Sequence, residues 1–186
     1  MSNSGEMLEL RHAFRPRGQC FLITTLWKEK VDICQDYEEL FKILNAYKIR
    51  YLVVGGQAVI FYSEPRYTKD MDVWVPPEIN NVETIFNALK HFGAPLKGMT
   101  AKDFKDKKMI FQIGLPPVRI DIMGSVPGVS IKKAWEKKKR THYGKSTIHV
   151  IDIKDLMRAK KTAGRPQDLL DYSKLMDRAK KRKKNN

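Results

Sequence analysis

Three aspartates are the residues of this chain best suited to carry chemistry. Asp70 and Asp72 lie in the alternating run Thr68–Val75, and Asp121 lies in a second alternating run, Val118–Met123. Because strand side chains alternate between the two faces of a sheet, Asp70 and Asp72 point to the same side. Carboxylates gathered at one place repel each other unless a cation lies between them. Mg²⁺ is bound in this way, through a few carboxylates together with substrate phosphates. Metal-assisted phosphoryl chemistry is therefore the first hypothesis.

A glycine pair upstream of the aspartates is a candidate phosphate-binding turn. Gly55 and Gly56 follow the continuous apolar run Tyr51–Val54, and a short helix, Gln57–Tyr62, is predicted after them. Glycine lets the backbone approach a ligand that a Cβ atom would exclude, and the first amides of a helix bind anions. Phosphates bound at this turn would lie near ions held by the first two aspartates. Taken alone, such a pair is most often only a tight turn.

Helices and strands that alternate along the chain must position these residues. A first amphipathic helix is predicted from its N-cap Asp36, because apolar residues recur from Tyr37 to Leu44 at helical spacing. We further predict a helix capped by Asn80 or Asn81 and ended by Gly93, a charged loop or frayed helix over 97–108, an antiparallel hairpin of Met109–Leu115 and Val118–Met123, a helix Ile131–Arg140, a strand Thr147–Ile151, and helices Ile153–Ala163 and Pro166–Ala179 on either side of Gly164.

These elements predict an α/β (α+β) fold, in which helices flank a mixed sheet and a helical pair follows at the C-terminus. A chain of 186 residues is long enough for one domain, which we place at residues 31–179. Residues 1–30 are expected to be a flexible N-terminal extension, and residues 180–186 a basic tail.

The net charge of +15 is concentrated in two segments. Residues 132–145 carry seven basic groups against one acid, and residues 178–186 carry six and no acid. Clustered positive charge attracts polyanions by releasing their counterions, which favours RNA or another large anionic partner. The alternative is that lysine-rich segments are simply solvated and keep the protein soluble.

Other sequence features narrow the setting. No apolar run approaches the roughly 18–20 residues that a membrane span needs, so no membrane partner is expected. Cys20 and Cys34 form no disulfide framework and lack metal-ligand spacing, and a cytoplasmic location follows as the default.

Several segments together resemble a known family. The segment Val53–Ala58, followed by Pro65–Asp72, is similar to the minimal nucleotidyltransferases of the DNA polymerase β-like superfamily. It looks in particular like the small bacterial branch that includes the nucleotidyltransferase toxins of toxin–antitoxin systems. The segments Pro116–Ile122 and Lys160–Leu169 look like later blocks of that branch. The resemblance covers about residues 34–176, although many superfamily members have Gly-Ser in place of Gly-Gly.

The resemblance implies a role for each matching position. Two Mg²⁺ ions would be held by Asp70, Asp72 and Asp121, the last of which could also act as a general base. A nucleoside triphosphate (NTP) would be the substrate, with its monophosphate transferred to a hydroxyl of a tRNA 3′ end or of a protein. The residues implied in nucleotide binding are Gly55, Gly56, Gln57, Arg66, Thr68, Lys160, Arg165 and Asp168.

Other interpretations stay open at this point. Asp70 and Asp72 could be solvent-facing residues of an edge strand, and Arg119 could pair with Asp121 in a structural ion pair. The same fold could also serve as a catalytically inactive module that binds RNA or a protein partner. A third reading is an antitoxin or regulatory partner with the basic tail as its interaction element.

Overall fold

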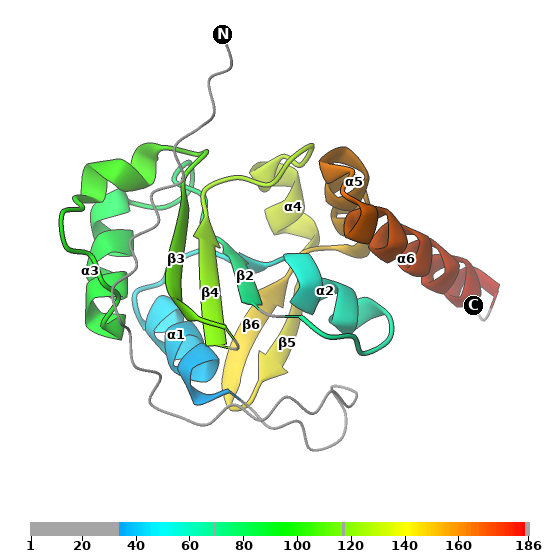
Figure 1. Ribbon diagram of the computed structural model, residues 1–186, viewed down its shortest axis with the longest axis horizontal. Coiled ribbons are helices and arrows are strands. Elements are labelled where there is room, and N and C mark those ends of the chain that lie inside the picture. Colours follow the sequence, from blue (N-terminus) through cyan, green and yellow to red (C-terminus); the bar gives the residue numbers. More distant parts are fainter. Residues whose placement is uncertain (1–33, 69, 117, 185–186) are drawn as a thin grey trace, which may run out of the picture.

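The computed structural model describes residues 34–68, 70–116 and 118–184. Within these residues a mixed sheet is flanked by helices, and two further helices follow it, as expected (Figure 1). The elements in chain order are α1 (Gln35–Ala46), β1 (Leu52–Val53), α2 (Gly55–Tyr62), β2 (Asp70–Trp74), α3 (Val82–Phe92), η1 (Ala101–Lys105), β3 (Ile110–Leu115), β4 (Val118–Met123), α4 (Ile131–Lys137), β5 (Lys139–Tyr143), β6 (Ser146–Val150), α5 (Ile153–Ala163) and α6 (Pro166–Lys184).

The strand order places the aspartates in the interior of the sheet. The described strands are ordered β3-β4-β2-β1-β6-β5. β2 runs parallel to β4 and antiparallel to β1, while β4 pairs with β3 in the antiparallel hairpin that the sequence predicts. Because β2 has a hydrogen-bonded neighbour on each side, the reading of Asp70 and Asp72 as residues of an edge strand is wrong.

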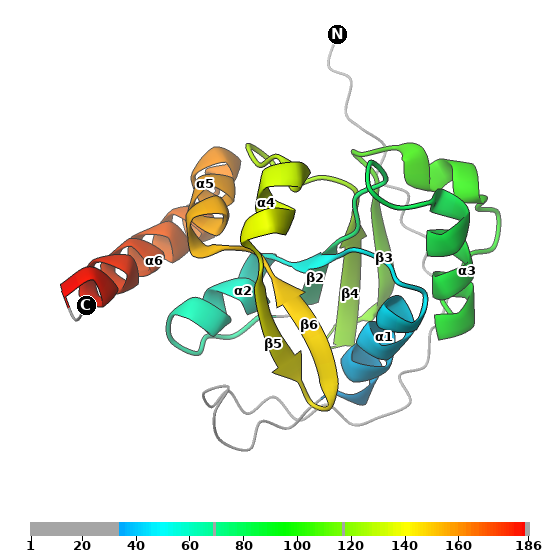
Figure 2. The ribbon, with the colours of Figure 1, turned by 180° about the vertical axis from the view of Figure 1, so that it is seen from behind.

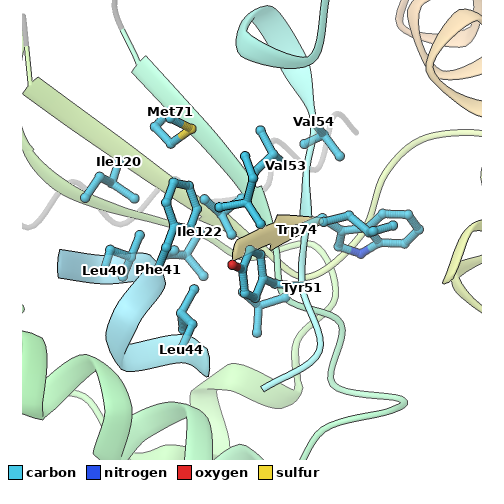
Figure 3. Packing of buried hydrophobic residues seen from close by; sticks show 14 of the residues in the cluster. Leu40, Phe41, Leu44, Tyr51, Val53, Val54, Met71, Trp74, Ile120 and Ile122 are labelled. Carbon is cyan, nitrogen blue, oxygen red and sulfur yellow. The ribbon is translucent and has the colours of Figure 1, made fainter. Parts of the chain in front are cut away.

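One face of the sheet is covered by α1, which leaves the other face for the carboxylates. Leu40, Phe41 and Leu44 of α1 are fully buried, and Leu40 and Phe41 lie toward Ile120 and Met71 (Figure 3). Burying a large apolar side chain stabilises a fold by about 1.5–3 kcal/mol, so this stripe fixes which face of β2 and β4 is apolar. Strand alternation then directs the neighbouring aspartates to the opposite face.

Most predicted helix ends are confirmed. The Asn81 side chain accepts hydrogen bonds from the amides of Glu83 and Thr84, and Gly93 ends α3 in the left-handed region. Gly164 ends α5 in the same way. The prediction for α1 is wrong, because Cys34 and not Asp36 is its N-cap. Asp36 instead lies buried in the first turn, where the helix dipole favours an acidic side chain.

The segment after α4 corrects the predicted helix Ile131–Arg140. The helix ends at Lys137, and Lys139–Tyr143 form strand β5, antiparallel to β6. α4 packs Ile131, Ala134 and Trp135 against the core, and no apolar residue follows Trp135 at helical spacing. The hairpin closes at Gly144, whose φ of 57° suits a tight turn.

Two further findings concern segments that the sequence left uncertain. The stretch 97–108 contains the short helix η1, which Thr100 and Asp103 stabilise with a capping box. α6 continues past Ala179 to Lys184, so the expected tail begins within a helix. Cys20 and the expected extension 1–30 lie outside the described residues. Among the described helices, none is both long and apolar enough to cross a membrane.

Candidate active site

The three aspartates lie together on neighbouring strands. The register of β2 and β4 places Asp72 directly beside Asp121 and Asp70 directly beside Arg119. In parallel strands such partners project to the same face of the sheet. Asp121 is 7% exposed, whereas Asp70 and Asp72 are half-buried. The fold therefore gathers the three carboxylates that the sequence singles out.

Arg119 forms ion pairs with two of these carboxylates. Its guanidinium contacts Asp70, and its Nε lies 3.0 Å from Oδ1 of Asp121. Gln112 of β3 also donates to Asp121, with Nε2 3.2 Å from Oδ1. The structural ion pair expected as an alternative for Asp121 is thus present, and it extends to Asp70. The role of Gln112 was missed, although its place opposite Asp121 follows from the hairpin register.

Asp72 lacks such an ion pair among the described residues, and its carboxylate is poorly compensated. Its Oδ2 accepts one long hydrogen bond, 3.4 Å from the amide nitrogen of Gly56. Burial and the negative charges of Asp70 and Asp121 raise the pKa of Asp72 to about 6. Burial likewise raises the pKa of Asp121, against the opposing effect of Arg119. A nearby cation would stabilise the ionised form of such a carboxylate.

The glycine pair is shaped by close contacts to the aspartate strand. A Cβ atom on Gly55, whose φ is 57°, would lie 1.8 Å from Oδ2 of Asp72. A Cβ atom on Gly56 would lie 2.6 Å from the Thr68 hydroxyl oxygen and 3.1 Å from Nη2 of Arg66. The pair is therefore more than a turn, because each glycine leaves room for a residue of the candidate site. Gln57 follows in the first turn of α2 and is half-buried.

Thr68 connects this glycine turn to the carboxylates. Its side chain is buried, and its hydroxyl lies 3.4 Å from Oδ1 of Asp70. The same hydroxyl is the nearest atom to the space above Gly56. Thr68 thus lies between the glycine turn and Asp70.

A network of charges, buried except for Arg165, joins the C-terminal helices to this region. The Lys160 ammonium lies 2.7 Å from Asp168 and 3.0 Å from Asp171, and Arg165 Nε lies 2.7 Å from Asp168. Arg66 reaches the same network, with Nη2 2.8 Å from Oδ2 of Asp171. The fully buried Asp171 was missed by the sequence reading, although its i, i+3 spacing from Asp168 places both acids on one face of α6.

The network lies within electrostatic range of the carboxylates. The charge of Lys160 acts to lower the pKa of Asp72. Asp168 is the main cause of the raised pKa of Arg165, and Asp72 and Asp70 contribute to it. α2, which begins at the glycine pair, packs against α5 and α6. The fold thus places the predicted cationic residues around the same site as the acids.

The side chains at this site are chemically suited to bind a hard divalent cation. Asp70, Asp72 and Asp121 offer the oxygen donors that Mg²⁺ prefers, and the mutual repulsion that raises the pKa of Asp72 would be relieved by a cation. In the arrangement described for residues 34–184, no group of three His, Cys, Asp or Glu side chains is spaced as a ready metal cage. Arg119 forms ion pairs with two of the three carboxylates in this arrangement.

Solved structures of low similarity are nucleotidyltransferase-like proteins. One is an antigenic nucleotidyltransferase-like protein from Paracoccidioides brasiliensis, with 16% identity, a TM-score of 0.49, and coverage of 76% of this chain and 74% of that one. The lincosamide antibiotic adenylyltransferase LnuA, solved with lincomycin bound, has 16% identity, a TM-score of 0.45, and coverage of 74% and 94%. The antibiotic-resistance factor ANT(2'')-Ia has 9% identity, a TM-score of 0.46, and coverage of 75% and 80%.

Sequence comparison gives a clearer assignment. Among curated protein sequences, none matches this chain. Residues 33–185 match the profile of the family described as "Nucleotidyl transferase of unknown function (DUF2204)". That match spans the glycine pair, the three aspartates and the charge network of the C-terminal helices, and the chain belongs to this nucleotidyl transferase family.

Proposed function

We propose that this protein transfers a nucleoside monophosphate from an NTP to a hydroxyl group and releases pyrophosphate. The observation that supports this most directly is the register that places Asp72 beside Asp121, with Asp70 on the same face and the Gly55–Gly56 turn in contact with Asp72. Membership of a nucleotidyl transferase family agrees with it.

The proposed roles follow from the position of each side chain. Asp70, Asp72 and Asp121 would hold Mg²⁺, which when bound supplies positive charge to offset the charge that develops on the phosphates. Gly55 and Gly56 would admit the triphosphate close to the backbone, beside the first amides of α2. Arg66, whose Nη2 lies 3.1 Å from the position of a Cβ atom on Gly56, would bind the phosphate oxygens together with Lys160 and Arg165 of the network.

The reaction exchanges one phosphorus–oxygen bond for another. The acceptor oxygen bonds to the α-phosphorus while the bond from that phosphorus to the bridging oxygen of the β-phosphate breaks. Pyrophosphate leaves with the electron pair of that bond. The hydroxyl proton passes to Asp121 or to water. Asp121 suits this role because burial raises its pKa above the ordinary value of a carboxyl group.

The acceptor that we propose is RNA, because the net charge of +15 favours a polyanion. The test incubates the protein with each labelled NTP, Mg²⁺, total tRNA and total protein, and then separates the products on denaturing gels. Label in RNA is expected, and the double variant Asp70→Asn/Asp72→Asn should lose it. Asp177→Asn, an exposed acid of α6, serves as the matched control and should retain activity.

Two outcomes would contradict the proposal. One is the absence of label from both RNA and protein with every NTP. The other is equal labelling by the wild type and the Asp70→Asn/Asp72→Asn variant, which would assign the activity to a contaminant. Label in protein alone would keep the reaction and correct the acceptor.

A second candidate is a catalytically inactive binding module on the same fold. The observation that favours it is Arg119, because its guanidinium already forms ion pairs with both Asp70 and Asp121. In an inactive module, the substitution Asp72→Asn should leave the affinities for Mg²⁺ and for an NTP unchanged. Isothermal titration of both proteins with Mg²⁺ and a non-hydrolysable NTP separates the two functions.

A further inference from the structure

A groove with cationic walls lies outside the candidate active site. It runs between the C-terminal half of α1 and the β5–β6 hairpin, which lie side by side in Figure 2, and its volume is about 700 Å³. Its lining residues are Lys42, Asn45, Ala46, Arg140, Lys145, Ser146, Thr147 and His149. None of them belongs to the carboxylate site, and the strands β6 and β1 separate β5 from β2.

Three exposed cations and one acid set the charge of this groove. Lys42, Arg140 and Lys145 are exposed along its walls. Glu38 lies at the rim, where its Oε1 is 3.2 Å from the Lys42 ammonium and accepts a hydrogen bond from the Lys145 amide at 3.0 Å. The groove therefore keeps a net positive charge, and Glu38 weakens it.

The positive surface continues from the groove toward α4. His149 packs edge-on against Trp135, with ring centroids 5.3 Å apart. The Lys138 ammonium lies 4.1 Å from the centre of the Trp135 ring, and the Arg50 guanidinium lies 6.0 Å from it. Burial, and then the charges of Lys138 and Arg140, lower the pKa of His149.

Hydrogen bonds to the main chain hold the floor of the groove. The Asn45 amide donates to the carbonyl of Thr147 at 2.8 Å, and the Tyr51 hydroxyl donates to the same carbonyl at 3.2 Å. The Ser146 hydroxyl donates to the carbonyl of Glu38 at 3.3 Å. α1 and the hairpin are thus fixed relative to each other, and a ligand that spans them meets a prepared surface.

We propose that this groove binds the sugar-phosphate backbone of single-stranded RNA and so holds the acceptor of the proposed reaction. Cations spread along a strip that includes aromatic rings are typical of surfaces that follow a single strand. Only the identification of this RNA as the acceptor rests on the proposed function. The binding itself requires neither nucleotide nor metal.

Charge-neutral variants with a matched control test the groove. Lys42→Gln/Arg140→Gln/Lys145→Gln removes three charges from its walls. Lys97→Gln/Lys102→Gln/Lys105→Gln removes three exposed charges near α3 and η1, at the other end of the sheet. The probe is a labelled RNA of about 12 nucleotides, and its anisotropy is measured without nucleotide or metal at salt concentrations of about 50 to 400 mM.

The expected result is specific to the groove. Three lost phosphate contacts should reduce the slope of log affinity against log salt by about 2, and affinity near the low end of the salt range should fall by at least about tenfold. The α3–η1 variant should stay within about twofold of the wild type. Glu38→Gln should tighten binding, because it removes the acid at the rim.

Equal losses in the two triple variants would overturn the proposal, because they would show that total charge and not the groove binds RNA. An unchanged salt slope in the groove variant would overturn it as well. If polyglutamate displaces the labelled RNA as efficiently as unlabelled RNA does, the groove binds acidic peptides instead. Unaltered RNA binding by Asp70→Asn/Asp72→Asn is expected, and it keeps this test separate from the test for nucleotidyl transfer.

Discussion

At the scale of single residues, Asp72 carries a charge that the fold does not compensate. Its pKa is raised to about 6 from an ordinary 3.8, chiefly by burial and then by the neighbouring Asp70 and Asp121. Ionised Asp72 therefore destabilises the folded state at neutral pH. Such strain is typical of sites that trade stability for function.

We expect Asp72→Asn to stabilise the protein in the absence of metal and nucleotide. A rise of about two pKa units corresponds to about 3 kcal/mol, so the free energy of unfolding at pH 7.5 should increase by up to about this amount. Asparagine keeps an oxygen that can accept from the Gly56 amide. Chemical denaturation with and without the substitution measures the change.

The pH profile of this gain provides the control. Because the folded-state pKa is raised, the penalty is absent below about pH 4 and is fully developed only above about pH 6. The stabilisation by Asp72→Asn should therefore fade as pH falls through that window. A gain of the same size at pH 4 and pH 7.5 would show that charge is not its cause.

Arg119 is the other single residue whose substitution should have a large effect, because we expect it to compete with a bound cation for two carboxylates. Its guanidinium contacts Asp70 and Asp121, and Arg119→Met keeps an apolar stem of similar reach without the charge. We expect the variant to bind Mn²⁺ at least about tenfold more tightly, since two unit charges within a few ångströms interact by several kcal/mol in a partly buried site. Electron paramagnetic resonance of free Mn²⁺ gives the affinity.

Two comparisons define what this experiment shows. In Lys107→Met, which removes an exposed cation that pairs with Glu78, Mn²⁺ affinity should not change. Weaker Mn²⁺ binding by Arg119→Met than by the wild type would mean that Arg119 organises the carboxylates and does not compete for them.

At the scale of elements, α5 and α6 are joined to the loop before β2 by one carboxylate. Asp171 is fully buried and contacts both Lys160 and Arg66, at 3.0 and 2.8 Å. Removing one partner of a buried ion pair leaves an uncompensated charge and typically costs 3–5 kcal/mol. The network thus fixes the helical pair against the glycine turn.

Asp171→Asn is therefore expected to lower the free energy of unfolding by about 3 kcal/mol. It should also weaken binding of a non-hydrolysable NTP, because Lys160 and Arg66 lose the group that positions them. Denaturation and isothermal titration measure the two effects. The exposed Asp177 of the same helix gives the matched control, whose asparagine variant should change stability by less than about 0.5 kcal/mol. Loss of stability with NTP affinity intact would limit Asp171 to a structural role.

Sequence reasoning succeeded where one local pattern determines the outcome. Alternation predicts β2 and β4, and Asn81 and Gly93 delimit α3 because their side-chain and backbone chemistry acts within a few residues. It failed where a distant partner decides. Residues Lys139–Tyr143 carry no strong strand pattern, and they become β5 because β6 supplies their hydrogen bonds.

The same distinction holds for the candidate site. The positions of Asp70, Asp72 and Asp121 followed from strand alternation and from the resemblance, whereas their roles stay predictions. Asp171 was missed because its importance depends on Arg66, which is 105 residues away. Arg119 was recognised as a partner of Asp121, but its reach to Asp70 depends on the parallel register of β2 and β4.

At the scale of the whole molecule, the positive charge is distributed over elements that lie apart from each other. One group lies in the groove of α1, β5 and β6, and another lies at the end of α6, which extends away from the sheet (Figure 1). Because α6 continues past Ala179, Lys180 and Lys181 lie on a helix that extends away from the sheet (Figure 1) and is distinct from the groove. Charges at sites that are far apart and do not contact each other are expected to contribute additively to the free energy of RNA binding.

Deletion of residues 180–186 should weaken RNA binding by this additive rule. The deletion removes five basic residues and no acid, which lowers the net charge from +15 to +10. It should lower the slope of log affinity against log salt, with about 0.7 for each lost phosphate contact, and leave Mn²⁺ affinity unchanged. Combining the deletion with the groove substitutions should give the sum of the two free-energy changes, within about 0.5 kcal/mol. If the combined variant loses no more affinity than the groove variant alone, the C-terminal segment and the groove do not act on the RNA independently. Equal salt slopes with and without residues 180–186 would exclude this segment from RNA binding.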